Sequence, residues 1–239
     1  FGFNEHGTAW SALILPQLEQ GALHDTLTFA ELGPGNYDGG GANQVACQTV
    51  LPVFRCPSAP LQLRDSGFQI PDRVPSTYIA NASGTGVIDG GLHNAGGIGQ
   101  INVDQNGMCY YNSRNGFRDV IDGTSSTVLV GEAATNLSQF ETGVNGRQEM
   151  DHWYIGSVAV DGDDSHRRDF SEFVGSLGPG INIMKDPLQD ADAKELSYGS
   201  WHTGGALFVF VDGSVKMLKD TIDASTRMAL GTRANGEVV

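Results

Sequence analysis

Long hydrophobic runs are missing from this chain of 239 residues. The longest uninterrupted apolar stretch, residues 206–211, is far shorter than the roughly 20 residues that a membrane-spanning helix needs. Positive charge is also scarce, since 14 lysines and arginines stand against 28 acidic residues and give a formal net charge of −14. The electrostatic field of a protein with this negative net charge repels phosphate backbones and anionic lipid surfaces. The sequence therefore argues against nucleic acid as a partner and against a membrane span within these residues.

Motifs of the common enzyme classes are absent as well. The sequence contains no Gly-x-x-x-x-Gly-Lys-Ser/Thr phosphate loop and no Gly-x-Gly-x-x-Gly placed between a strand and a helix. No serine lies in a Gly-x-Ser-x-Gly elbow. We therefore expect a protein that is not an enzyme, with a hydrolase built around His202 and Asp212 as the weakest alternative.

Glycine is abundant, with 33 residues, roughly twice its average share of about 7%. Residues 59–100 combine prolines with glycine-rich stretches and are expected to form a long loop-rich insertion. Residues 8–27 carry apolar side chains near helical spacing, but Pro16 must break the helix that they predict. Five segments are predicted to form strands, at residues 48–54, 77–80, 107–113, 127–132 and 153–160.

The clearest local signal is a β-hairpin near the C-terminus. Two short apolar runs, residues 206–211 and 215–218, flank Asp212-Gly213-Ser214. Asp-Gly supplies the positive φ that tight hairpin turns prefer. We predict an antiparallel hairpin over about residues 201–219.

His202, Gly204, Gly205, Asp212 and Gly213 form a signature around this hairpin. The two glycines before the first strand allow a close approach of backbone. His202 is expected to fasten the start of that strand by hydrogen bonds, while metal ligation and catalysis are its alternative roles.

The same signature, a histidine followed after nine residues by Asp-Gly, resembles the processing-associated C-terminal motif of a large prepilin-like (pseudopilin) family that is abundant in planctomycete-type bacteria. Other segments resemble this family in the same order along the chain. They are residues 10–20 (WSALILPQLEQ), 53–58 (VFRCPS), 118–125 (RDVIDGTS), 130–132 (VGE) and 230–233 (LGTR).

The resemblance implies an α+β, pilin-like fold in which an N-terminal helix packs on an antiparallel β-sheet with long loop-rich insertions, all in one head domain over residues 1–239. It also implies an exported structural subunit of a filament or secretion apparatus, of the type IV pilus or type II secretion kind, located outside the cell, on its surface or in the periplasm. Sister subunits would be the partners, in a homo-oligomer or filament. The family's hydrophobic N-terminal helix does not occur after Phe1, so we expect it upstream, as the sole contact with a membrane.

An acidic loop offers a candidate cofactor site, for Ca²⁺. Its carboxylates, at alternating positions that suit calcium, are Asp161, Asp163, Asp164, Asp169 and nearby Glu172. Basic residues at 166–168 interrupt them and favour a solvated charged loop instead. The alternative to a structural subunit is therefore an extracellular module that binds a glycan or calcium.

The three cysteines, Cys47, Cys56 and Cys109, show no Cys-x-x-Cys spacing. Their residue spacing alone leaves the redox compartment open. The resemblance places Cys56 in a recurrent Cys-Pro-Ser segment, and Cys47 and Cys109 where relatives usually carry other residues. The resemblance implies export and therefore an oxidising environment. In this way it also implies a disulfide between Cys47 and Cys109.

Overall fold

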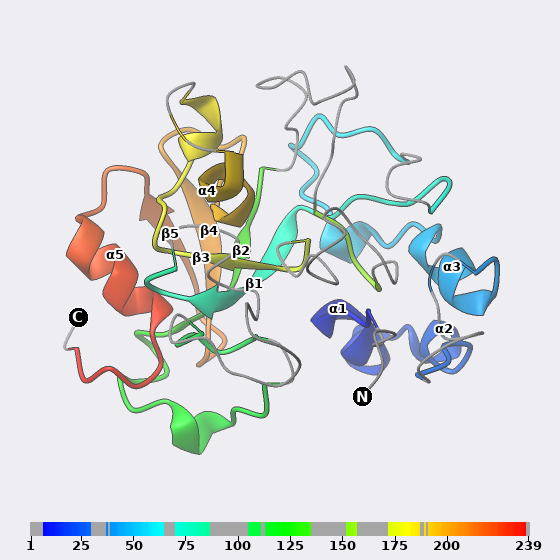
Figure 1. The fold of residues 1–239 in the computed structure, drawn as a ribbon, viewed down its shortest axis with the longest axis horizontal. Helices are drawn as coiled ribbons and strands as arrows, with labels where there is room; N and C mark the ends of the chain where they lie inside the picture. Colours follow the sequence, from blue (N-terminus) through cyan, green and yellow to red (C-terminus); the bar gives the residue numbers. More distant parts are fainter. Residues whose placement is uncertain are drawn as a thin grey trace.

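The computed structural model describes residues 7–29, 37, 39–64, 70–86, 105–110, 113–134, 152–156, 172–186, 189 and 191–237. It is an α+β structure built on a five-stranded sheet with the strand order β3-β1-β2-β4-β5 (Figure 1). The strands are β1 (Tyr78–Ser83), β2 (Val128–Glu132), β3 (Val174–Ser176), β4 (Gly205–Phe210) and β5 (Val215–Lys219).

The sheet is mixed, not purely antiparallel as expected. β1 with β2, β2 with β4, and β4 with β5 pair antiparallel. β3 instead runs parallel to β1, with Ala80 opposite Val174. A parallel partner so distant in sequence needs a crossover connection, which the alternation of side chains along a single strand does not reveal.

The N-terminal segment is helical but broken, as predicted. It forms α1 (Trp10–Leu13), the 3₁₀ helix η1 (Leu15–Leu18) and α2 (Gly21–His24). Pro16 lies in the first turn of η1, and Glu19 ends it in the left-handed conformation with φ of 60°. The pieces change direction at these points, so no single long helix covers the sheet in this part of the structure.

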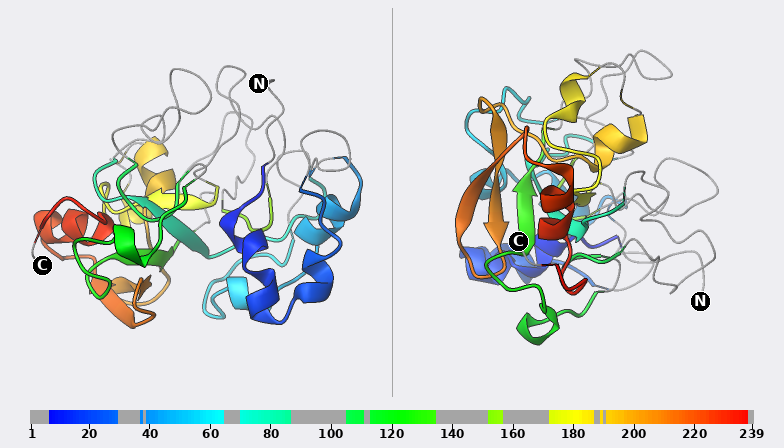
Figure 2. Two further views of the ribbon diagram at one scale, coloured as in Figure 1. Left: turned by 90° about the horizontal axis from the view of Figure 1, so that it is seen from below. Right: turned by 90° about the vertical axis from the view of Figure 1, so that its left-hand side faces the viewer.

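These short helices, together with α3 (Ala42–Cys47), gather on one side of the molecule, away from α5 (Ala224–Gly231) and the β4–β5 hairpin (Figures 1 and 2). They surround a hydrophobic cluster of their own. Its buried members include Ala12, Leu15, Cys47, Leu51, Phe54, Tyr154 and Ile155. We call it the N-terminal cluster.

The two faces of the sheet are covered differently. On one face, Ile79, Phe208 and Leu230 belong to a buried cluster to which α5 contributes. On the other face, Ala80 and Ala82 of β1 pack in a cluster with Trp153, Phe173 and Leu196, the last from α4 (Ala191–Leu196). We call these the α5-side cluster and the Trp153 cluster. The remaining short elements are 3₁₀ helices: η3 (Pro52–Phe54), η5 (Phe117–Asp119) and η7 (Ile183–Lys185).

Among the predicted strands, those at residues 77–80 and 127–132 and the C-terminal hairpin are confirmed as β1, β2 and β4–β5. The strand predicted at 48–54 is wrong, because Pro52 starts a 3₁₀ turn there. No strand occurs in the described part of 107–113. Within the predicted strand at 153–160, the described residues 153–156 form isolated bridges, one of them between Pro75 and Trp153. Across the described ranges, each helix is too short to cross a membrane.

Candidate functional site

The signature hairpin closes with a three-residue loop. The Phe210 amide donates to the carbonyl of Ser214 at 2.9 Å, and the Gly213 amide donates to that of Phe210 at 2.9 Å, so residues 211–213 form the loop. Gly213 has a φ of 84°, which a three-residue hairpin loop requires at its last position. Asp212 accepts from the Ser214 hydroxyl at 2.6 Å and the Ser214 amide at 2.9 Å. These hydrogen bonds hold the pKa of the Asp212 carboxyl below its ordinary value of 3.8.

The two glycines before β4 serve different needs. A Cβ on Gly205 would lie 2.1 Å from the backbone carbonyl oxygen of Leu218 on β5, so only glycine allows the strands to pair this closely. Gly204 has open space around its Cα but a φ of 82°, a left-handed conformation.

His202 lies in the turn that leads into β4 and meets two side chains from distant segments. Its Nε2 is 3.5 Å from Sγ of Cys56 and 3.3 Å from Oε1 of Glu132. Cys56 follows η3, and Glu132 ends β2. The thiol, imidazole and carboxylate atoms all lie within 4.8 Å of one another. We call these three residues the Cys–Glu–His cluster.

Backbone and hydroxyl contacts fix the position of each member of the cluster. The second carboxylate oxygen of Glu132, Oε2, accepts from the Leu207 amide at 2.8 Å. The His202 amide donates to Oγ of Ser200 at 3.0 Å, and the Cys56 amide donates to Oγ1 of Thr77 at 2.6 Å. Hydrogen bonds with Leu207 in β4, Ser200 before β4 and Thr77 just before β1 therefore position the cluster.

The cluster is buried on one side and reaches solvent on the other. The side chain of Glu132 is 3% exposed, whereas that of His202 is 37% exposed. Neighbouring Tyr78 has a pKa raised first by its burial and then by the nearby charges of Cys56 and Glu132.

Sequence motifs contained all three members of the cluster but did not show that they meet. His202 was part of the C-terminal signature, Cys56 of Cys-Pro-Ser and Glu132 of Val-Gly-Glu. The alternative pairing of His202 with Asp212 does not occur, because β4 separates them. Six strand residues span about 20 Å, with the histidine before the strand and Asp212 after it.

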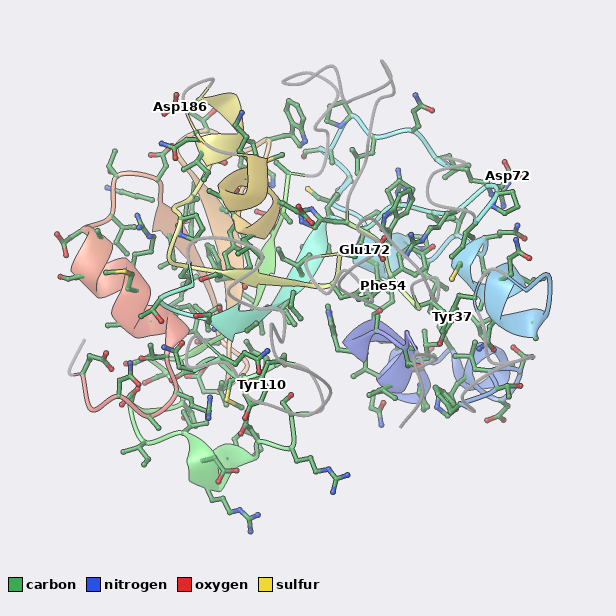
Figure 3. The ribbon with its side chains drawn as sticks, in the orientation of Figure 1. Tyr37, Phe54, Asp72, Tyr110, Glu172 and Asp186 are labelled. Carbon is green, nitrogen blue, oxygen red and sulfur yellow. The ribbon has the colours of Figure 1, made fainter. Side chains whose placement is uncertain are left out.

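The acidic candidates for calcium fall into two groups. Asp161, Asp163, Asp164 and Asp169 lie outside the described residues. Glu172 is fully buried, and both of its oxygens accept from the Arg73 guanidinium, at 2.9 and 2.7 Å. In the view of Figure 3, Glu172 is drawn between β1 and α3. Its carboxylate is thus bound to a cation already present in the protein.

The Cys47–Cys109 disulfide expected from the resemblance is not formed, since all three cysteines are free thiols. Cys47 belongs to the N-terminal cluster, whereas Cys109 packs against the Trp153 cluster. Burial raises the pKa of Cys47 to about 12 and that of Cys109 to about 11, which keeps both thiols protonated.

Comparisons with known proteins identify the family. No curated protein and no solved structure matches the chain. The family model SBP_bac_10, described as "Protein of unknown function (DUF1559)", matches residues 1–225, nearly the whole chain. This is a family of planctomycete-type pilin-like proteins, so the resemblance is supported at the level of the family. The chain therefore belongs to the DUF1559 family.

Proposed function

We propose that this domain is the exported head of a pilin-like structural subunit that assembles with sister copies and is displayed at the cell surface. The observation that carries the proposal is an exposed apolar face on the signature hairpin. This proposal includes the processing-associated role of the signature, an upstream hydrophobic helix as anchor, and the absence of enzymatic activity.

The apolar face consists of the outward side chains of β4 and β5. Leu207 and Met217 stand directly opposite each other across the strands and are 40% and 47% exposed. Val215, 61% exposed, lies opposite the partly exposed Val209 on the same face. The alternate residues of the hairpin, including Ala206, Phe208 and Leu218, are buried in the α5-side cluster.

This face continues a surface that is covered elsewhere in the sheet. Over β1, the Trp153 cluster packs on the corresponding side, with Val130 of β2 at its border. Over the hairpin, the described residues leave the apolar side chains in solvent. Contiguous exposed apolar residues of this kind mark protein–protein contact surfaces.

A sister copy is the occupant that fits best. β5 is the edge strand of the sheet, so the hairpin lies at the border of the sheet. Two copies could bring the apolar faces of their hairpins together in a self-complementary contact. Lys216 and Lys219 on the edge strand β5 discourage uncontrolled strand-to-strand pairing, and by the register Lys219 shares the face of Leu207 and Met217. The net charge of −14 opposes association of free heads, so a shared anchor would have to hold them together.

The test is cryo-electron microscopy of the full-length protein in its native source, labelled with an antibody against this domain. We expect labelled periodic fibres or short surface assemblies with the unchanged protein. Replacing Leu207→Glu together with Met217→Glu places two more acids on the apolar face and should abolish these assemblies while the labelled protein stays on the surface.

The matched control is Phe117→Glu with Ile121→Glu, which are also exposed apolar residues but lie in and after η5. Assemblies should persist in this variant. Labelled cells without any assembly of the unchanged protein would overturn the proposal and favour a solitary binding module. Equal loss in both double variants would mean that added acidity, not the hairpin face, disrupts assembly.

A further inference from the structure

We propose that Cys56, Glu132 and His202 form a binding site for a single divalent transition-metal ion of the zinc class, with the fourth ligand position open to water. The site would be present in each copy of the domain and does not depend on the assembly proposed above.

Two of the three distances between ligand atoms in the cluster match those of a tetrahedral zinc site, and the third pair, Cys56 and Glu132, lies within 4.8 Å. Bonds of about 2.3 Å to sulfur, 2.0–2.1 Å to nitrogen and 2.0–2.2 Å to oxygen separate neighbouring ligand atoms by roughly 3.3–3.6 Å. The structure has Sγ of Cys56 and Oε1 of Glu132 at 3.5 and 3.3 Å from Nε2 of His202. An ion could therefore be bound through small rotations of side chains.

Hydrogen bonding alone does not account for both contacts of the His202 ring. Both contacts are made to the same ring nitrogen of His202, Nε2. That nitrogen carries either one proton or one lone pair, so it makes one linear hydrogen bond at a time. A metal ion, in contrast, bonds the sulfur, the nitrogen and the oxygen together.

The same geometry argues against a Cys–His–acid catalytic triad. In such a triad the acid orients the histidine through the ring nitrogen that does not meet the nucleophile. Here Glu132 and Cys56 share Nε2. A sulfur, a nitrogen and an oxygen atom that converge in this way have the arrangement of the ligands in a metal site.

Charge and donor type favour a zinc-class ion over calcium. A thiolate and a carboxylate supply two negative charges, which a divalent ion neutralises. The Glu132 side chain is almost entirely buried, where an ionised carboxylate is costly unless a cation compensates it. Thiolate and imidazole ligands select zinc and related ions, whereas calcium and magnesium take oxygen ligands.

Supporting contacts orient the site. The Leu207 amide holds Oε2 of Glu132 and so turns Oε1 toward the other two ligands. Hydrogen bonds of this outer kind raise metal affinity by fixing the ligands. Because the His202 side chain is partly exposed, water can reach the fourth position. The ion would connect the ends of η3 and β2 to the start of β4.

Cobalt(II) and zinc(II) are the probes for the test. The purified chain, with its thiols reduced and its metals removed by a chelator, is titrated with Co²⁺. We expect a thiolate-to-cobalt charge-transfer band and the visible absorption of tetrahedral cobalt, at one ion per chain and displaced by Zn²⁺. Cys56→Ser should abolish the charge-transfer band. His202→Gln should weaken Zn²⁺ binding by more than the 10–100-fold typical of an outer-shell contact.

Cys109→Ser is the matched control, since it removes a partly buried thiol outside the cluster and should leave the cobalt spectrum unchanged. Circular dichroism verifies that each variant is folded; if Cys56→Ser is not, the partly exposed His202 carries the test through His202→Gln. A folded unchanged chain without a thiolate–cobalt band would overturn the proposal. So would a band that persists in Cys56→Ser or is lost in Cys109→Ser.

Discussion

Arg73 and Glu172 form a fully buried ion pair in the centre of the protein, with side chains 0% exposed. The guanidinium makes two parallel hydrogen bonds to the carboxylate, and its Nη2 also donates to the Gly156 carbonyl at 2.7 Å. Its Cζ lies 4.3 Å from the centre of the Trp153 ring. The pair thus connects residues 99 positions apart in the chain.

Removing one partner of this pair should be strongly destabilising, because the other charge would remain buried. We expect Glu172→Gln to lower the free energy of unfolding by about 3–5 kcal/mol, measured by urea denaturation. The control is Arg118→Gln, which breaks an exposed contact of 3.8 Å to Asp119 and should cost at most about 1 kcal/mol. Equal, small effects would mean that water reaches Arg73 and Glu172.

Residue identities in the site were partly predictable, but their partners were not. The assignment of Glu172 to the acidic loop followed from sequence proximity, while its actual partner, Arg73, lies far upstream. His202, Cys56 and Glu132 were each singled out by motif, yet their convergence depends on how β1, β2 and β4 pair. Long-range pairing has no signature in a single sequence.

The hairpin β4–β5 depends on glycine at two positions for different physical reasons, which gives an internal control. Gly205→Ala places a methyl group against the backbone of Leu218, which cannot rotate away. We expect a loss of at least about 3 kcal/mol in the free energy of unfolding, at the upper end of overpacking effects. Gly204→Ala meets no atom but must keep its φ of 82°, so it should lose about 1–2 kcal/mol.

Thermal and urea denaturation of both variants would measure these differences. Comparable losses would show that the strands move apart to admit the methyl group at 205, and the close approach to Leu218 would then be dispensable.

Elements with local signals were predicted best. Asp212-Gly213 and the short apolar runs on either side sufficed to predict β4–β5. Pro16 sufficed for the broken N-terminal helix. In contrast, β-branched and aromatic content at 48–54 suggested a strand, but Pro52 starts a 3₁₀ turn and Phe54 is buried in the N-terminal cluster. Strand propensity is realised by pairing with a neighbouring strand, and residues 48–54 pair with none of the described strands.

The N-terminal cluster and the Trp153 cluster are two separate cores, and Trp10 joins them. It packs against both the N-terminal cluster and the Trp153 cluster. Its ring lies edge-on to Phe54, with centroids 6.0 Å apart, and its Nε1 donates to the Phe173 carbonyl at 2.9 Å. Because one residue contributes to both cores, unfolding of one should carry the other with it.

Trp10→Leu should therefore separate the unfolding of the N-terminal cluster from that of the Trp153 cluster and the sheet on which it packs. For the unchanged chain we expect one unfolding transition, seen at the same urea concentration by circular dichroism and by hydrogen exchange in residues 42–56 and 205–219. In Trp10→Leu, residues 42–56 should lose protection at a lower concentration than residues 205–219. Leu51→Ala, which creates a cavity in the N-terminal cluster alone, should lower the midpoint but keep one transition, since the Trp10 contacts remain. A single coincident transition in Trp10→Leu would mean that other contacts, among them the Arg73–Glu172 pair and the hydrogen bond from the Thr77 amide to the Phe54 carbonyl, suffice to couple the two cores.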